Sequence, residues 1–231
     1  MVARPVGTAC QANGAGAKLA TMTIMTSRPR RGRPPKVARD FPDTREALIR
    51  CGMEILTEQG FMSTGIEAVL KRIGVPKGSF YHYFESKEAF GQAVLERYSA
   101  YFARKLDRWL LQDEVPPLQR LRDFVEDSKA GMAKYEFRRG CLVGNLGQEV
   151  AILPESFRDQ LEATLCDWQC RLAACLRLAR ERGQLAADAD CDGLAAFFWI
   201  GWEGAVQRAR LVRNGAPLEI FLAGFLAGLP R

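Results

Sequence analysis

The chain has 231 residues, 48% of them hydrophobic, which is enough for a sizeable core and excludes a wholly disordered protein. Its longest apolar run, residues 194–202, is too short to cross a bilayer, so we expect no membrane partner. Residues 1–40 carry a net charge of +7, whereas the other 191 residues carry 25 cations and 26 acids. A basic arm on a near-neutral body predicts a polyanionic partner.

Helical periodicity recurs along the chain and no strand alternation is sustained, so we predict an all-α fold. The residues Asp43 to Glu46 form a capping-box pattern that would begin the first helix. Gly74 would end the second helix, Pro76 suits the first turn of the third, and Ser86 would cap the fourth. The predicted helices span residues 43–60, 65–73, 76–83, 86–111, 118–135, 154–182, 191–213 and 217–229.

Two stretches of the body suit helix packing. Apolar residues from Phe157 to Ala179 recur mostly at alternating steps of four and three, which is a heptad-like seam. Small residues mark one face of the helix predicted over residues 191–213. We expect the seam and this face to pair with their copies in a homodimer; the alternative is that the seam packs within one subunit. Residues 138–150 form a glycine-containing connection.

The cysteine pattern indicates a reducing compartment. Seven cysteines are present, an odd number, and no pair of them has metal-ligand spacing with the single histidine. We therefore expect a cytoplasmic protein without disulfides, bound metal or another cofactor. Residues 1–27 lack the continuous apolar segment of a signal peptide and are expected to be a disordered leader, within which Met22 or Met25 is an alternative start.

The stretch "VPKGSFYHYFESKEAF", residues 75–90, crowds aromatic rings between two lysines. Two short helices joined by Gly74 and Val75 form a helix-turn-helix, whose second helix enters the major groove of DNA with its N-terminus first. Phe80 and Phe84 are expected to face the core. A plain core helix with an aromatic cluster is the alternative. The residues expected to reach bases or phosphates are Lys77, Gly78, Ser79, Tyr81, His82, Tyr83 and Lys87.

The segment "STGIEAVLKRIGVPKGSFYHYFESKEAF" resembles the DNA-binding signature of TetR-family transcriptional regulators, and the resemblance covers residues 43–95. It implies a homodimeric repressor that binds double-stranded operator DNA and whose variable C-terminal body binds a small effector. Pro76 departs from the polar cap that is frequent in the family. The implied backbone contacts are Tyr81, Tyr83 and Lys87, and the implied contacts near the bases are Lys77 and Ser79.

The segment "RPRRGRPPK", residues 28–36, precedes this unit. Within it Arg31 and Arg33 flank a glycine and resemble the core of an AT-hook, which lays arginines in a narrow minor groove. The alternative is a solvated basic arm with nonspecific attraction for DNA. The resulting division is a disordered basic arm (1–42), a three-helix helix-turn-helix DNA-binding domain (43–85) and a larger C-terminal helical domain for effector binding and dimerisation (86–231).

Two segments of the body, "EFRRGCLVGNLGQEV" (136–150) and "FFWIGWEGAVQRARL" (197–211), resemble the acrylate-responsive branch of the TetR family. The resemblance implies acrylate or a related small unsaturated carboxylate as the effector. Arg138 or Arg139 would hold the carboxylate. The expected effector contacts are Arg138, Arg139, Cys141, Asn145, Trp199, Trp202 and Glu203.

Cys141 leaves alternatives open. The Gly-Cys-Leu element at residues 140–142 is also similar to the branch that senses electrophiles such as N-ethylmaleimide and quinones. Cys141 would be a reactive thiol if a cation and a helix N-terminus lowered its pKa, or else a buried and inert one. Trp199 and Trp202 would line the pocket or belong to the core. A Cys141-dependent enzyme is disfavoured, because the single histidine lies in the DNA-reading helix.

Overall fold

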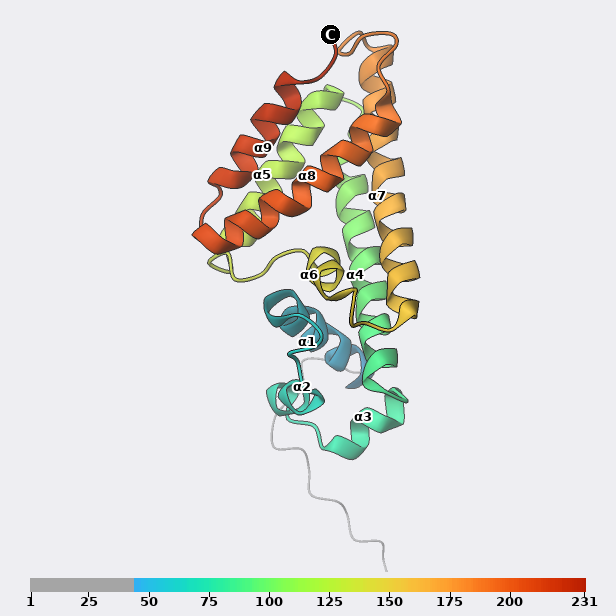
Figure 1. Cartoon of the computed structure of the whole chain (residues 1–231), viewed down its shortest axis with the longest axis vertical. Helices are drawn as coiled ribbons and strands as arrows, with labels where there is room; N and C mark the ends of the chain where they lie inside the picture. Colours follow the sequence, from blue (N-terminus) through green and yellow to red (C-terminus); the bar gives the residue numbers. More distant parts are fainter. Residues whose placement is uncertain (1–43) are drawn as a thin grey trace, which may run out of the picture. The chain divides into compact units, whose positions relative to one another are not determined.

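The computed structural model describes residues 44–231, which form nine helices and no strand (Figure 1). The predicted all-α fold is therefore confirmed over this part of the chain. No helix within it is both long and apolar enough to cross a membrane. The helices are α1 (Thr44–Gln59), α2 (Ile66–Ile73), α3 (Lys77–Tyr83), α4 (Lys87–Leu110), α5 (Pro117–Ala133), α6 (Leu142–Glu149), α7 (Glu155–Glu181), α8 (Cys191–Val212) and α9 (Ala216–Ala227).

Local sequence signals set the ends of α2, α3 and α4. Gly74 ends α2 in the left-handed region, with φ of 67°, a conformation that glycine adopts without the steric cost other residues pay. Pro76 is the residue before α3 rather than a residue of its first turn. The Ser86 hydroxyl caps α4 by accepting a hydrogen bond of 3.0 Å from the backbone N–H of Ala89. The cap expected at Asp43 lies outside the described residues.

An aromatic cluster holds α3 against the start of α4. The rings of Phe80, Phe84 and Phe90 lie with their centroids 5.1 to 5.5 Å apart, and all three side chains are buried. Aromatic pairs in such geometry stabilise a fold by about 0.5–1.5 kcal/mol each beyond the area that they bury. The prediction that Phe80 and Phe84 face the core is therefore confirmed.

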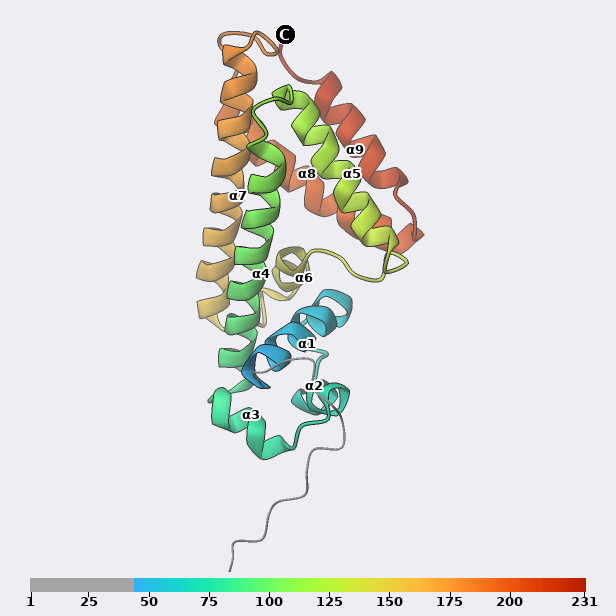
Figure 2. The ribbon, with the colours of Figure 1, turned by 180° about the vertical axis from the view of Figure 1, so that it is seen from behind.

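The body is built around α4 and α7, which run side by side in both views (Figures 1 and 2). Trp168 of α7 packs against Phe102 of α4, with 4.3 Å between ring centroids, and against Trp199 of α8, with 5.0 Å. The hydroxyls of Ser99 and Thr164 lie 2.9 Å apart and join α4 to α7 through a polar contact within this apolar packing. α9 packs against α8, and α5 packs against α4, α7 and α9, which completes the body.

Three details differ from the sequence predictions. The glycine-containing connection includes a helix, α6, with Leu142, Val143 and Leu146 buried. Tyr101 belongs to the stripe of the fourth predicted helix that helical periodicity predicts to face inward, with Phe90, Val94, Tyr98 and Phe102, yet it is 50% exposed and lines a cavity. The seam of α7 is covered within one chain: the buried residues include Phe157, Leu161, Trp168, Leu172 and Ala179. The expectation that this seam forms the dimer interface is therefore wrong.

Candidate functional site

The exposed face of α3 carries most of the residues expected to reach DNA. Lys77, Gly78, Tyr81 and His82 are exposed, whereas the other side of the helix is buried through Phe80. A Cβ atom built on Gly78 would have no atom within 4 Å, so the fold itself does not require glycine there. Three further expected contacts are half-buried, namely Ser79, Tyr83 and Lys87. Arg31 and Arg33 lie outside the described residues.

Lys87 takes part in packing as well as offering charge at the start of α4. Its ammonium lies 4.4 Å from the centroid of the Phe61 ring and 3.5 Å from the carbonyl oxygen of Met62. Burial lowers the pKa of this ammonium, and the carboxylate of Glu149 opposes that shift. A phosphate contact would therefore draw Lys87 away from an existing cation–π contact.

A cavity of about 410 Å³ opens between α1, α4, α5, α8 and the segment that precedes α6. Its volume is within the range of small-molecule sites, roughly 300–1,000 Å³. Apolar and aromatic side chains make up much of the wall. The lining residues include Tyr98, Phe102, Lys105, Ser128, Met132, Tyr135, Arg139, Cys141 and Trp202.

Cations outnumber carboxylates on the wall of this cavity. Arg50, Lys105 and Arg139 line it, against the single carboxylate of Glu54 among the described residues. Lys105 is also paired with Asp127 at 2.8 Å. The buried hydroxyl of Ser128 lines the cavity and has no hydrogen-bond partner within residues 44–231. A small anion placed here would lie near the positive charge of Arg50, Lys105 and Arg139.

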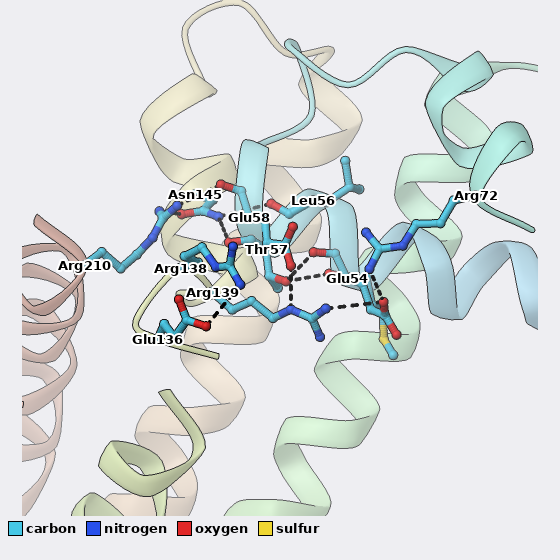
Figure 3. Close-up of polar contacts among 11 residues, drawn as sticks. Glu54, Leu56, Thr57, Glu58, Arg72, Glu136, Arg138, Arg139, Asn145 and Arg210 are labelled. Atoms are coloured by element: carbon cyan, nitrogen blue, oxygen red, sulfur yellow. Dashed lines mark hydrogen bonds and ion pairs between the residues drawn. The ribbon is translucent and has the colours of Figure 1, made fainter. Parts of the chain in front are cut away.

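Arg139 is already engaged by two carboxylates of α1 (Figure 3). Its Nε donates to Glu58 at 2.8 Å, and its Nη2 donates to Glu54 at 3.3 Å. The guanidinium carbon also lies 4.0 Å above the ring of Tyr135. Arg139 is therefore held at the boundary between the cavity and the first helix of the helix-turn-helix unit.

Arg138 and Asn145 lie elsewhere, on a neighbouring groove of about 690 Å³. Arg138 is mostly exposed and lies 3.5 Å from the carboxylate of Glu136. Asn145 donates to the carbonyls of Leu56 and Thr57 at 3.1 and 2.9 Å, and accepts from Arg210 at 2.7 Å (Figure 3). These carbonyls are at the end of α1, where they also accept from the backbone N–H groups of Gly60 and Gly140 at 3.0 and 3.2 Å. Asn145 thus adds a side-chain contact to the C-terminus of α1.

Cys141 lines the cavity, and Glu203 lies behind it. Burial and then the charge of Glu203 raise the pKa of the Cys141 thiol well above its usual value, although the backbone N–H of Gly144 lowers it. Burial raises the pKa of Glu203 to about 7. Cys141 is therefore not arranged to provide a thiolate at neutral pH.

The two tryptophans differ in their relation to the cavity. Both are 2% exposed, but Trp202 lines the cavity, whereas Trp199 packs against Trp168 in the aromatic core and does not line it. The structure thus brings Arg139, Cys141 and Trp202 to one cavity. Whether these residues bind an effector stays a prediction.

Sequence reasoning missed several residues of the cavity, chiefly Tyr98, Lys105 and Ser128. A signal was present for two of them. Tyr98 and Lys105 are seven residues apart and share a face of α4 with Phe102, so a lysine falls on the apolar stripe of that helix. A cation in such a stripe marks a cavity or a buried ion pair.

A helix-turn-helix unit with an exposed second helix, joined to a helical body that contains a cavity, defines a DNA-binding regulatory protein. Residues 48–94 match the model "Bacterial regulatory proteins, tetR family", and residues 117–225 match "Tetracyclin repressor-like, C-terminal domain". The chain belongs to the TetR family of transcriptional regulators and is a helix-turn-helix DNA-binding repressor. The predicted family is therefore confirmed. The prediction that the chain is a regulator rather than an enzyme is confirmed as well.

The chain is similar to several individual proteins over most of their length. The transcriptional regulator AcuR of Cereibacter sphaeroides is 51% identical over 205 residues, which are 89% of this chain and 93% of the relative. The crystal structure of a regulatory protein TetR from Rhodobacter sphaeroides has 50% identity and a TM-score of 0.78, and the match covers 80% of this chain and 97% of that one. The reduced form of E. coli NemR has 33% identity and a TM-score of 0.71, covering 79% and 95%.

Proposed function

We propose that this repressor binds operator DNA as a homodimer and is released by a small unsaturated carboxylate, with acrylate as the first candidate. The observation that carries the proposal is the cavity of about 410 Å³, whose wall has three cations against one carboxylate. The resemblance of residues 136–150 and 197–211 to acrylate-responsive regulators and the similarity to AcuR support the same effector class.

In this proposal the cavity recognises both ends of the acid. Arg139 receives the carboxylate, because a guanidinium binds a carboxylate through two parallel hydrogen bonds. Phe102, Met132 and Trp202 provide the apolar wall that the vinyl group requires. Arg138, on the neighbouring groove, takes no part in this binding.

Capture of the acid is reversible. The Cys141 thiol is buried and its pKa is raised, so it is protonated at neutral pH and is a poor nucleophile. Covalent sensing of electrophiles through Cys141 is the second candidate, because this thiol lines the cavity. The two modes differ in one variant: Cys141→Ser keeps its response to acrylate under reversible capture and loses it under covalent sensing.

The homodimer surface is assigned to α8 and α9. Phe197 and Ile200 of α8 are 59% and 74% exposed, and Ile220 of α9 is 72% exposed. Large apolar side chains gathered on neighbouring helices favour a protein partner, and a second copy would also set two recognition helices about one turn of DNA apart, ~34–36 Å.

In this proposal each part of the chain has the role that the sequence predicts for it. Residues 43–85 bind DNA, residues 86–231 bind the effector and dimerise, and the basic arm of residues 1–42 adds attraction for phosphates, with Arg31 and Arg33 in the minor groove. Effector binding favours an arrangement of the dimer in which the spacing of the recognition helices no longer fits the operator.

The test is release of DNA. A labelled fragment that the protein selects from a random DNA library is titrated with acrylate, propionate and acrylamide while anisotropy is recorded. We expect acrylate to release the fragment and acrylamide, which lacks the charge, to leave it bound. Equal release by propionate would mean recognition by charge and size alone. Release by quinones but by neither acid would refute the carboxylate proposal in favour of electrophile sensing.

A further inference from the structure

Arg139 belongs both to the cavity and to the DNA-binding unit. It is only 18% exposed, and its hydrogen bonds go to Glu58 and Glu54 on α1 (Figure 3). The Nε bond to Glu58 measures 2.8 Å, whereas the Nη2 bond to Glu54 measures 3.3 Å. The shorter bond is the stronger one, so Glu58 is the anchor of this arginine and Glu54 is the weaker partner.

One oxygen of Glu54 joins three segments of the chain. Oε2 of Glu54 accepts from Arg139 and also, at 2.8 Å, from Nη2 of Arg72 on α2 (Figure 3). The wall of the cavity is therefore linked through a single carboxylate to both α1 and α2. Whatever draws Arg139 away from Glu54 alters the contacts that hold α2 to the cavity wall.

We propose that the carboxylate of the effector competes with Glu54 for Arg139, so that Glu54 is an internal occupant of the effector's anion site. This inference rests on the function proposed above. Nη1 of Arg139 has no hydrogen bond with any residue from 44 to 231. A bidentate carboxylate would use Nη1 and an N–H of Nη2 together, which leaves Nε with Glu58 and brings the acid next to Glu54 at Nη2.

Charge repulsion between the effector and Glu54 then favours displacement of Glu54 from Arg139. Glu54 lines the same cavity, so a second carboxylate at the Nη edge of Arg139 would lie beside it, and like charges at such distances repel. Among residues 44–231, Glu54 then keeps its ion pair with Arg72. Binding of the effector thus opposes the link from the cavity to α2.

The far end of α1 remains attached during this exchange. Asn145 and Arg210 hold the last carbonyls of α1, and Glu149 accepts from the N–H of Phe61 at 2.8 Å. Asn145, Arg210 and Glu149 line the neighbouring groove rather than the cavity. The effector therefore releases α1 and α2 on one side while their anchor on the other side persists, which is the arrangement of a hinge.

The experiment measures acrylate binding by calorimetry without DNA, using the full-length protein. Glu54→Gln keeps the shape of the side chain and removes its charge. We expect it to bind acrylate about two- to fivefold more tightly, which is the range for a half-exposed ion pair. Arg72→Gln leaves Arg139 as the remaining ion-pair partner of Glu54 within residues 44–231 and should weaken acrylate binding.

The matched control is Glu67→Gln, which removes another carboxylate of the DNA-binding unit. Glu67 is highly exposed, pairs with Lys77 at 3.7 Å and does not line the cavity, so its loss should leave acrylate affinity unchanged. Because the link from the cavity to α2 runs through Glu54, acrylate should also reduce operator affinity less in Glu54→Gln than in the wild type, and in each protein the operator should weaken acrylate binding by the factor by which acrylate weakens operator binding.

Two results would overturn the inference in distinguishable ways. If the wild type binds acrylate and Glu54→Gln binds it equally well, the competition is refuted while the effector proposal stands. If the wild type does not bind acrylate at all, the effector proposal fails and the competition fails with it.

Discussion

The buried carboxyl group of Glu203 should make the protein less stable as the pH rises, and Glu203→Gln should remove that dependence. Both carboxylate oxygens are shielded from solvent and have no hydrogen-bond partner within residues 44–231. Burial raises the pKa of this group from 4.5 to about 7, and the neighbouring Cys141 thiol lowers it only in part. The variant is nearly isosteric and cannot ionise.

The sign and the size of the change in stability follow from the pKa of Glu203, which is 4.5 in the unfolded chain and about 7 in the folded one. Below pH 4.5 the group is protonated in both the folded and the unfolded chain and costs nothing. Between pH 4.5 and about 7 the unfolded chain ionises first, so the free energy of unfolding falls. Above that range the loss is complete, at about 3 kcal/mol for a shift of this size.

Urea unfolding of the wild type and of Glu203→Gln, at pH values from 5 to 8 and at one protein concentration, measures this directly. The difference between the two curves cancels the other titrating groups, the single histidine included. We expect the wild type to lose about 2–3 kcal/mol relative to the variant between the ends of this range. Curves that stay parallel within about 0.5 kcal/mol, the usual effect of a neutral substitution, would refute an unpaired buried carboxyl.

Two further predictions concern DNA and assembly. Gly78→Ala should raise the stability of the protein by up to about 1 kcal/mol, since alanine favours a helix and has space here, yet weaken operator binding because the added methyl group faces the DNA; an unchanged operator affinity would place Gly78 away from the DNA. Ile200→Glu should give folded monomers in sedimentation with lost operator binding, whereas Leu172→Glu should unfold the chain in circular dichroism, because Leu172 is 1% exposed within one subunit. A stable dimer in the first variant would move the interface elsewhere.

Much of the DNA-binding unit follows from local rules. Gly74 and Ser86 act through their own backbone neighbourhoods, and the spacing of Phe80 and Phe84 places both on one face of a short helix. Signals of this kind depend on a few adjacent residues, so the sequence alone predicts them.

The cavity depends on contacts between distant segments, and the sequence predicts it less well. Both Arg138 and Arg139 looked suitable for a carboxylate, and only the fold separates them, because neighbouring residues in a loop point to different surfaces. The sequence does not predict α6, since its two glycines disfavour a helix, and buried leucines override that propensity. The α7 seam was assigned to the dimer because a heptad pattern does not say which helix covers it.

The central claim is tested most directly by measuring how acrylate releases DNA from Arg139→Gln, from Arg138→Gln and from the wild type. The two variants remove the same charge from adjacent residues, one on the cavity and one on the neighbouring groove. Operator binding is first measured without effector, and acrylate is then titrated against each complex. We predict that Arg138→Gln responds as the wild type does and that Arg139→Gln responds only at concentrations at least about tenfold higher, the loss of a charge-assisted bidentate contact. An equal response of both variants, or loss of the response in Arg138→Gln alone, would contradict recognition of the effector at Arg139.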